Sequence, residues 1–584
     1  MTSGPTEETV EGGLSEPTEL EPEQGSLDLA QAEDVHTRAD WEAETAKVLR
    51  KSRRMTDDDP DDLVWQKLTR TTLDGIAVAP LGTPELLEDL TTSGRPTRAG
   101  AWDIRARFSA GAAKAVNEEI LVDLNGGVTS LWLGLTSDTD FDTLLHEVLL
   151  DLAPVVLDAG QDAAGVARAF LEQVGDAELH PETNLGVPAS EATAEVADLA
   201  RDRGILAFVV DATPVHDQGA SDAQELGHSM ALAAAYLRTM TEAGSSVEDA
   251  AALVEFRYAV TDEQFPSIAK LRAARRLWAR VQELCDAEPV AQRQHAVTSR
   301  PMMSSYDPWV NMLRTTVAAF AGGVGGADSV TVLPFDSPLG RPDTLGRRVA
   351  RNTSHLLIDE SHVAKVADPA GGSYAVEKLT DDLAVAAWDV FGRLEAGESL
   401  DEMVAAVAEA REKQVATRKR PLTGVTEFPN LAEQLPERVA DGAWDGVRPY
   451  GASFEAMRAE PAQAPVFLAT LGTVASHTAR ATFASNLLAA GGIAVDVAGA
   501  TSSTDDLIAA YKGQPVVCLA GSDPTYAEWG EAAAAALREA GAVRVIIAGV
   551  STSSTTDVFD RVDDSCATGV DALAFLTRTR EALS

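Results

Sequence analysis

The segment from Phe467 to Gly499 contains one candidate cofactor-binding loop, whose sequence is GTVASHTAR. They predict an apolar strand, this loop, a helix and a second strand, which is how a doubly wound α/β domain begins. In such a domain a cofactor binds at the first loop. This loop contains one glycine, Gly472, and no carboxylate. The order of elements therefore predicts a binding domain, and the residue types leave open whether the loop still binds anything.

His216, in DATPVHDQGAS, is the second candidate. It follows directly after the apolar run ILAFVVDA, and catalytic groups gather at the C-terminal ends of barrel strands. Catalytic and structural roles both stay open for His216. By contrast, His228, His355 and His362 have no partners at metal-ligand spacing, which favours surface or structural roles for them.

The glycine-rich run GGVGGAD, residues 322–328, follows an expected helix and precedes an expected strand. Phosphate-binding loops run from strand to helix, so that the helix N-terminus faces the anion. The run is therefore predicted to be a turn. The acidic run TDDDPDD lacks the spacing of a calcium loop and is predicted to be a solvated turn. No P-loop, Gly-x-Ser-x-Gly elbow or His-Glu-x-x-His helix occurs.

The amino-acid composition argues against some classes of binding partner. A formal net charge of −43 over 584 residues opposes nucleic acids and anionic membranes. Cys285, Cys518 and Cys566 are far apart in sequence, so neither a disulfide framework nor a Cys-x-x-Cys metal site is expected. No targeting segment or membrane span is evident, and a cytoplasmic location is expected.

The elements that must position these candidates form two repeating patterns. Strands alternate with amphipathic helices from about Arg98 to Val415, which predicts a (β/α)₈ TIM barrel. A helix capped by Ser221 follows the strand before His216. The alternation restarts at Val466 with the size and strand order of a flavodoxin-like fold. The predicted segments are an acidic disordered tail (1–34), an N-terminal arm (35–97), the barrel (98–420), a linker (421–463) and the flavodoxin-like domain (464–584).

Several long runs resemble the cobalamin-dependent acyl-CoA mutases, chiefly methylmalonyl-CoA mutase. The resemblance covers the chain from about Asp40 to its end. The runs are DPWVNMLRTTVAAFAGG, IAKLRAARRLWARV, RRVARNTSHLLIDESHVAKVADPAGGSYAVEKLTDDLAVAAWDVF and, in the arm, VWQKLTRTTLDGIAVAPL. This family interconverts methylmalonyl-CoA and succinyl-CoA by radical chemistry that begins at the cobalt–carbon bond of adenosylcobalamin.

The resemblance implies that the cofactor loop has lost its ligands. The family carries Asp-x-His-x-x-Gly after the first strand of the C-terminal domain, and its His ligates cobalt. Those positions fall on Val474, Ser476 and Ala479, and an upstream family lysine falls on Thr470. His477 is one residue away from the ligand position and lacks the carboxylate that would orient it.

Substrate groups are also missing from the barrel. The family pattern Trp-x-Ile-Arg-x-Tyr matches WDIRARF, which retains Arg105 but places Arg107 where the tyrosine contacts the substrate. A preceding substrate arginine falls on Gly100. The family's Tyr-His pair reads Val215-His216.

A chain with the scaffold of this family but without its cofactor and substrate groups resembles the non-catalytic small subunit of heterodimeric methylmalonyl-CoA mutases. No catalytic, cofactor-binding or metal-binding residue is then expected on this chain, and adenosylcobalamin would bind the large partner subunit. Two alternatives stay open. One is a self-sufficient acyl-CoA mutase with an altered substrate. The other is a sensor that holds a small molecule in its flavodoxin-like domain, with Ser522 and the STSSTT loop as polar contacts.

Overall fold

The computed structural model describes residues 35–92, 94–95, 97–160 and 162–584. The predicted acidic tail, 1–34, lies outside the described residues. The described residues form two compact units, and the first consists of 35–70 together with Ala77–Pro80. Its helices α1 (Arg38–Lys51) and α2 (Leu63–Leu68) bury Ala46, Leu49, Met55 and Val64 in a small core. The short strands β1 (Arg70–Thr71) and β2 (Ala77–Val78) pair with each other.

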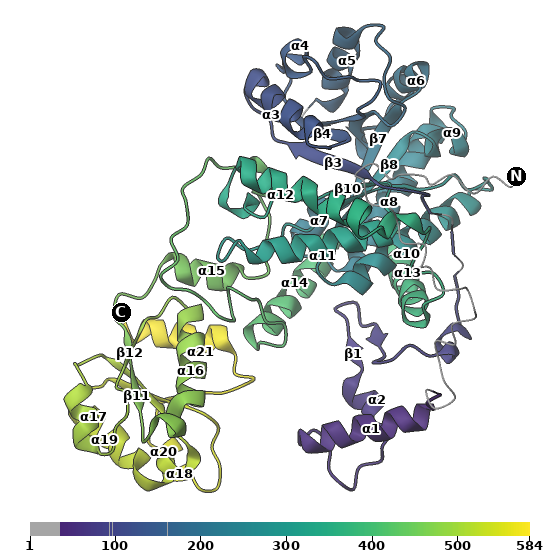
Figure 1. Cartoon of the computed structure of the whole chain (residues 1–584). Coiled ribbons are helices and arrows are strands. Elements are labelled where there is room, and N and C mark those ends of the chain that lie inside the picture. The colour runs from purple at the N-terminus through teal and green to yellow at the C-terminus, as the bar shows by residue number, and fades with distance from the viewer. Residues whose placement is uncertain (1–34, 93, 96, 161) are drawn as a thin grey trace, which may run out of the picture. The chain divides into compact units, whose positions relative to one another are not determined.

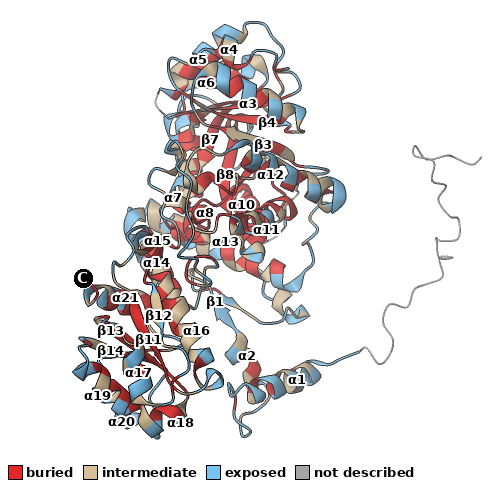
Figure 2. Cartoon of the chain, turned by 60° about the vertical axis from the view of Figure 1, so that its left-hand side comes forward, coloured by how far each residue is buried: buried red, intermediate tan, exposed pale blue. Residues whose placement is uncertain are grey.

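The second unit contains a closed barrel of eight parallel strands, which confirms the predicted TIM barrel (Figure 1). The strands are β3 (Asp103–Phe108), β4 (Ser130–Leu135), β5 (Val155–Ala159), β6 (Asn184–Pro188), β7 (Leu206–Asp211), β8 (Val254–Val260), β9 (Arg293–Thr298) and β10 (Ser329–Thr331). The barrel closes where β10 pairs with β3, through Ser329 opposite Asp103. Because helices cover the outside of such a barrel, its strands are buried on both faces. All seven residues of β8 are buried accordingly, and Figure 2 shows the barrel strands in red.

The helices of this part of the unit follow the expected alternation. They are α3 (Ala113–Asn125), α4 (Phe141–Leu144), α5 (Ala163–Val174), α6 (Ala194–Arg203), α7 (Thr213–Asp217), α8 (Asp222–Glu242), α9 (Val247–Ala251), α10 (Gln264–Glu283), α11 (Val310–Val324), α12 (Thr344–His355), α13 (Tyr374–Glu395), α14 (Leu400–Ala416) and α15 (Ala452–Ala459). Ser221 caps α8 through a capping box with Gln224, as the sequence predicts. The run GGVGGAD ends α11 and leads into β10, which confirms that it is a helix-to-strand turn.

A five-stranded parallel sheet of the order β12-β11-β13-β14-β15 forms the C-terminal part, and it confirms the flavodoxin-like order. Its strands are β11 (Val466–Thr470), β12 (Val495–Val497), β13 (Val516–Ala520), β14 (Arg544–Ala548) and β15 (Asp564–Cys566). Its helices are α16 (Val474–Ala490), α17 (Thr504–Ala510), α18 (Asp523–Thr525), α19 (Glu531–Glu539), α20 (Thr556–Phe559) and α21 (Ala572–Glu581). No helix in the described part of the chain is long and apolar enough to cross a membrane.

Cys518 and Cys566 share one buried core cluster of this sheet, although they are far apart in sequence. Both are free thiols. A hydrogen bond with Cys566, together with burial, holds the pKa of Cys518 well above its usual value. The two cysteines therefore act as core residues.

Candidate functional site

The cofactor loop of the C-terminal sheet is shorter than its sequence suggests, because α16 begins at Val474. Gly472 turns the chain with a φ of +81°, a conformation that favours glycine. The side chain of Val474 is 63% exposed at the start of the helix. The hydroxyl of Ser476 lies 2.9 Å from that of Thr473, so this polar group is already hydrogen-bonded within the first turn.

The other positions of the expected cobalt-ligand pattern also offer no ligand. Thr470 is fully buried and accepts a hydrogen bond at its carbonyl from Thr501, at 2.7 Å. Ala479 is exposed. His477 is 6% exposed, and its Nδ1 has no hydrogen-bond partner. An imidazole buried against the helix does not present a nitrogen to a metal outside it.

Arg480, one turn after His477, fills the crevice of the sheet, and sequence reasoning missed this residue. In a doubly wound sheet, ligands bind where the strand order reverses, which here is between β11 and β13. The guanidinium of Arg480 donates to the carbonyl of Gly521, at 2.6 Å, and lies 4.9 Å from the ring centroid of Tyr526. A Cβ added to Gly549 would lie only 3.1 Å from Cζ of Arg480, so the guanidinium packs closely against this glycine. Arg480 therefore links the loops after β11, β13 and β14, and these residues do not fit adenosylcobalamin.

An ion pair lies inside the barrel. Arg105 on β3 donates from Nη1 to both carboxylate oxygens of Glu255 on β8, at 2.8 and 3.0 Å. Its Nε donates to the hydroxyl of Ser130 on β4, at 2.8 Å. The side chains of Arg105 and Glu255 are only 2% and 6% exposed. The arginine that matches the family pattern is therefore bound inside the barrel by partners from this chain.

A stack of aromatic and cationic side chains fills the same interior. The guanidinium of Arg257 on β8 lies 4.1 Å from the ring centroid of Trp132 on β4. Trp132 also makes an edge contact with His295 on β9, at 5.2 Å between centroids. Arg257 pairs with Asp211, at 2.7 Å, and donates to Nδ1 of His295, at 3.1 Å.

The protonation of His295 follows from this packing. Burial lowers the pKa of His295 well below its usual value, and Arg105 and Arg257 lower it further. The ring is therefore neutral, and because its Nδ1 accepts from Arg257, its Nε2 donates to Thr331 on β10, at 2.7 Å. Side chains from six neighbouring strands thus meet inside the barrel and fill it as a packed core.

The two substituted substrate positions lie apart. Gly100 is in an exposed turn before β3, with a φ of +80° and open space around it. Arg107 is at the C-terminal end of β3, and its side chain is 16% exposed. Of these two positions, only Arg107 therefore lies at the mouth of the barrel.

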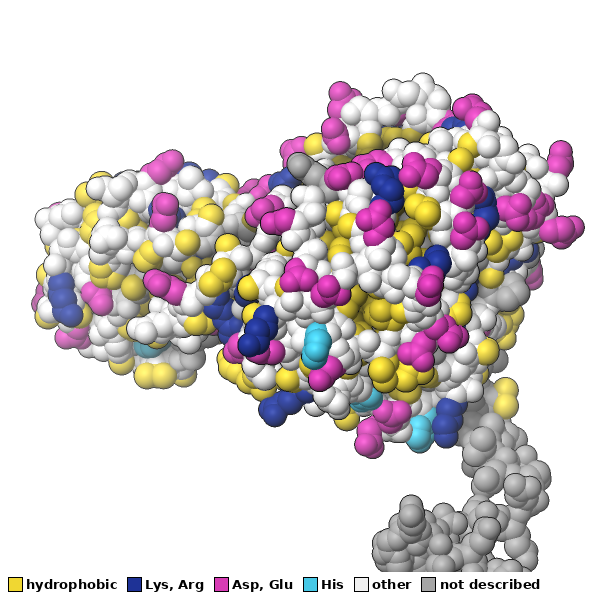
Figure 3. Space-filling view, turned by 90° about the horizontal axis from the view of Figure 1, so that it is seen from above, with side chains coloured by type: hydrophobic (Ala, Val, Ile, Leu, Met, Phe, Trp, Pro, Cys, Tyr) yellow, Lys and Arg dark blue, Asp and Glu magenta, His cyan; other side chains and the backbone are white. Residues whose placement is uncertain are grey.

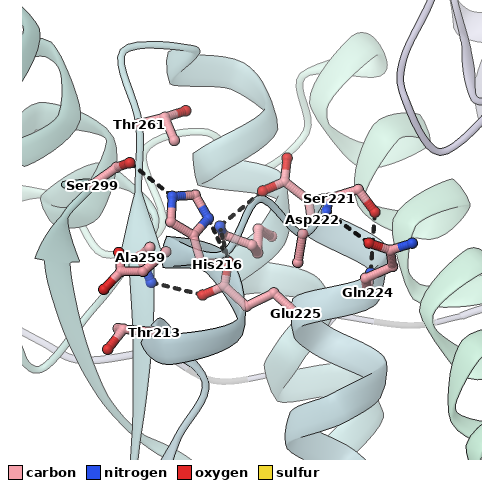
Figure 4. Close-up of polar contacts among 12 residues, drawn as sticks. Thr213, His216, Ser221, Asp222, Gln224, Glu225, Ala259, Thr261 and Ser299 are labelled. Atoms are coloured by element: carbon pink, nitrogen blue, oxygen red, sulfur yellow. Dashed lines mark hydrogen bonds and ion pairs between the residues drawn. The ribbon is translucent and has the colours of Figure 1, made fainter. Parts of the chain in front are cut away.

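His216 lies just after β7, as predicted, within the short helix α7 (Figure 4). Its Nε2 is 2.7 Å from the hydroxyl of Ser299, and its Nδ1 is 3.3 Å from a carboxylate oxygen of Glu225. Serine, histidine and a carboxylate in this order could activate a nucleophile. However, all three side chains are at most 3% exposed, so no substrate reaches Ser299. The structure favours a structural role for His216.

Glu225 connects His216 to a buried charge cluster. Its Oε1 accepts from the backbone of Ala259, at 2.7 Å, and its Oε2 pairs with Lys270, at 2.8 Å. Lys270 also pairs with Asp222, at 2.8 Å. The network joins the start of α8 to α10 and β8. Across the described residues, no group of three or more His, Cys, Asp or Glu side chains is arranged to hold a metal.

Asp74 adds a carboxylate to the edge of this cluster. It accepts from the backbone of Ala223, at 3.4 Å. Burial raises the pKa of Asp74 to about 6, and the neighbouring Asp222 contributes to the rise. A carboxyl group whose pKa is higher in the folded state than in the unfolded chain stabilises the fold when the pH lies below the ordinary carboxyl pKa. This stabilisation is lost as the pH rises through about 6. At neutral pH the ionised Asp74 therefore lowers the stability of the fold.

We expect Asp74→Asn to stabilise the chain at pH 7.5 by about 1 to 2 kcal/mol, and by less at pH 5. The amide oxygen can still accept from Ala223 without bringing a charge beside Asp222. Thermal unfolding of both proteins at the two pH values measures the effect. Asp57→Asn, at an exposed position, is the control and should change nothing. A stabilisation that is the same at both pH values would contradict this role of Asp74.

Comparisons with known proteins identify the family to which this chain is similar. A family model described as methylmalonyl-CoA mutase matches residues 204–501. The chain is 46% identical over 528 residues to the methylmalonyl-CoA mutase small subunit of Streptomyces virginiae, covering 82% of this chain and 84% of that protein. Against the small subunit of Propionibacterium freudenreichii subsp. shermanii, the identity is 33%, with 94% and 95% covered. The methylmalonyl-CoA mutase of Cereibacter sphaeroides is 32% identical, but over only 50% of this chain and 42% of that protein.

Proposed function

The chain belongs to the methylmalonyl-CoA mutase family, and on this premise we propose that it is the non-catalytic small subunit of a heterodimeric, adenosylcobalamin-dependent methylmalonyl-CoA mutase. The large subunit binds the cofactor and the CoA ester and interconverts methylmalonyl-CoA and succinyl-CoA. This chain supplies a homologous barrel and C-terminal domain, together with the arm at 35–97, which contacts the partner. The complex works in the cytoplasm.

One observation supports the proposal: this chain's own side chains pack against one another inside the barrel and at the crevice of the C-terminal sheet, where the resemblance implies that substrate and cofactor bind in the family. Arg105, Trp132 and Arg257 fill the barrel interior, and Arg480 fills the crevice of the C-terminal sheet. Each arginine there is hydrogen-bonded to neighbours within the chain. Expelling the buried, hydrogen-bonded Arg105 or Arg257 to admit a ligand would cost several kcal/mol. We therefore assign no catalytic, cofactor-binding or metal-binding residue to this chain.

The relatives support the same assignment. Proteins named as small subunits match most of this chain, whereas the Cereibacter mutase matches half of it. The family model begins at residue 204, after the first strands of the barrel. Gly100 and Arg107, the two positions at which the resemblance implies lost substrate groups, both precede that residue.

The two alternatives from the sequence are less well supported. A self-sufficient mutase needs a cobalt ligand and a path for a CoA ester, and the residues at both places are packed against their own chain. A small-molecule sensor would use Ser522, but the hydroxyl of Ser522 caps α18 by accepting from the backbone of Thr525. A helix-capping role explains this serine without a ligand.

We expect this chain to co-purify with a cobalamin-binding mutase subunit as a one-to-one complex. A permanent interface of more than roughly 2,000 Å² would resist gel filtration. Co-expression followed by light scattering measures the stoichiometry. A variant lacking residues 1–34 should still assemble, because that segment has little apolar surface to bury. A variant lacking residues 1–80 should not. A stable homodimer that ignores the large subunit would refute the proposal.

A further inference from the structure

The outer face of α11, a helix that the structure describes throughout, carries no charged side chain. Its residues that are not buried are Val310, Met312, Leu313, Thr316, Val317 and Phe320. The charged residue of the helix, Arg314, is buried and donates to Asn311 and to the carbonyl of Thr423. A helix that faces water normally has a polar outer face, and a helix that is apolar all round is normally covered. The composition of α11 is therefore that of a covered helix.

Another helix of the same barrel shows the ordinary pattern. The outer face of α6 exposes the charged residues Glu195, Asp198, Arg201 and Asp202. Over the whole sequence, 24% of the residues are charged and the formal net charge is −43. Figure 3 shows how widely acidic side chains are scattered over one face of the molecule. The uncharged outer face is therefore a local property of α11 and not a general property of the barrel.

An apolar hollow of about 510 Å³ continues this face at the C-terminal end of α11. It is lined by Phe320 and Val324 of α11, by Phe265 near the start of α10, and by Val363 and Val366 between α12 and α13. None of its lining residues, all within the described part of the chain, is Asp, Glu, Lys or Arg. Protein interfaces commonly centre on an aromatic or aliphatic anchor that fills such a hollow. The outer face of α11 and this hollow together are called the α11 face below.

The segment that forms the rim of the hollow is held in position by buried hydrogen bonds. Arg272 of α10 donates to the carboxylates of Asp368 and Glu377. Glu377 also accepts from the backbone of Gly372, at 3.1 Å. A surface that is ordered before binding loses less conformational entropy when a partner docks on it. The rim of the hollow is therefore preformed.

The α11 face is large enough to support a stable protein complex. Four of its large side chains are 57% to 70% exposed, namely Phe265, Trp309, Leu313 and Val366. Together they expose on the order of 400 to 500 Å² of apolar surface. A stable interface buries roughly 800 Å² on each partner, and roughly 60% of that area is apolar. The exposed apolar area therefore matches what one side of such an interface needs.

We propose that the barrel of the homologous large subunit docks on the α11 face, an inference that rests on the proposed function given above. The runs DPWVNMLRTTVAAFAGG and SHVAKVADPAGGSY build most of this face, and both belong to the resemblance to the mutase family. A homologous partner is therefore expected to present a corresponding apolar face, and two such faces can cover each other about a pseudo-twofold axis. A second copy of this chain fits less well, because it would bring another formal charge of −43 to the contact.

Binding of the full-length chain to the immobilised large mutase subunit of the same organism, measured by biolayer interferometry, tests the α11 face. Leu313→Glu should weaken binding about a hundredfold, because it buries a charge without a counter-ion in the interface. Phe265→Glu, on a different helix, should have a similar effect. Leu152→Glu is the matched control, because Leu152 is 66% exposed, against 70% for Leu313, but lies between α4 and β5. The control should bind like the wild type.

The outcomes separate this inference from the proposed function. If the wild type does not bind the large subunit, the proposed function fails, and the docking site fails with it. If the wild type binds but Leu313→Glu and Phe265→Glu bind like Leu152→Glu, the docking site is overturned while the proposed function stands. If Leu313→Glu does not fold, as judged by circular dichroism, Phe265→Glu decides. A dimer of the isolated chain that Leu313→Glu dissociates, as measured by light scattering, would assign the face to a second copy and would also overturn the proposal.

Discussion

Lys270→Met should lower the free energy of unfolding at pH 7.5 by about 3 to 5 kcal/mol, which is the cost of breaking a buried charge network. The side chain of Lys270 is fully buried between Asp222 and Glu225, at 2.8 Å from each. Methionine fills a similar volume but leaves two carboxylates without their cation. Urea unfolding followed by circular dichroism measures the loss.

The loss should be smaller at pH 5 than at pH 7.5. Burial favours a raised pKa for Asp222, but Lys270 outweighs it and holds this pKa below its usual value. Without Lys270 burial raises the pKa of Asp222 above its value in the unfolded chain, so the defect grows as the pH rises through that pKa. Lys378→Met, at a partly exposed pair with Asp382, is the control and should cost less than about 1 kcal/mol. An equally small loss for Lys270→Met would show that the network does not support the barrel.

Glu255→Leu should destabilise the chain by about 3 kcal/mol or more, because it leaves Arg105 charged inside the barrel. After the change, the nearest carboxylate described for Arg105 is Asp103, at 3.8 Å. The double variant Arg105→Leu, Glu255→Leu should recover part of the loss, since no unpaired charge remains. A double-mutant cycle from thermal unfolding gives the coupling energy.

The control for this cycle is Glu182→Leu, which removes the partner of Arg293 in a pair that is about 40% exposed on both sides. It should cost less than about 1 kcal/mol. If Glu255→Leu is as mild as Glu182→Leu, the barrel interior is open to water. The claim that this chain fills its own substrate space would then fail.

Local patterns made much of the fold predictable. The strand before His216, the Ser221 cap and the turn at GGVGGAD depend on residues close together in sequence, and the structure confirms all three. The short strand β15 has the sequence DSC, which carries no apolar run. Its place in the sheet depends on pairing with β14, which periodicity does not reveal.

The contents of the candidate sites depend on pairs that one sequence does not specify. Arg105 and Glu255 are 150 residues apart in the chain. His216 forms a hydrogen bond with Ser299, and Arg480 donates to the carbonyl of Gly521 in the loop after β13. The sequence could single out Val474 and Ser476 only through its resemblance to the family pattern. The packing of Arg480 against the loops after β13 and β14 could be seen only in three dimensions.

The central claim is that this chain holds no cofactor and does no chemistry of its own. Its most direct test is to incubate the purified full-length chain with adenosylcobalamin, pass it through gel filtration, record the corrinoid absorbance and assay turnover of methylmalonyl-CoA. We predict no retained corrinoid and no turnover by this chain alone, and both properties once the large subunit is present. Stoichiometric cobalamin on the isolated chain, or turnover without a second subunit, would contradict the account.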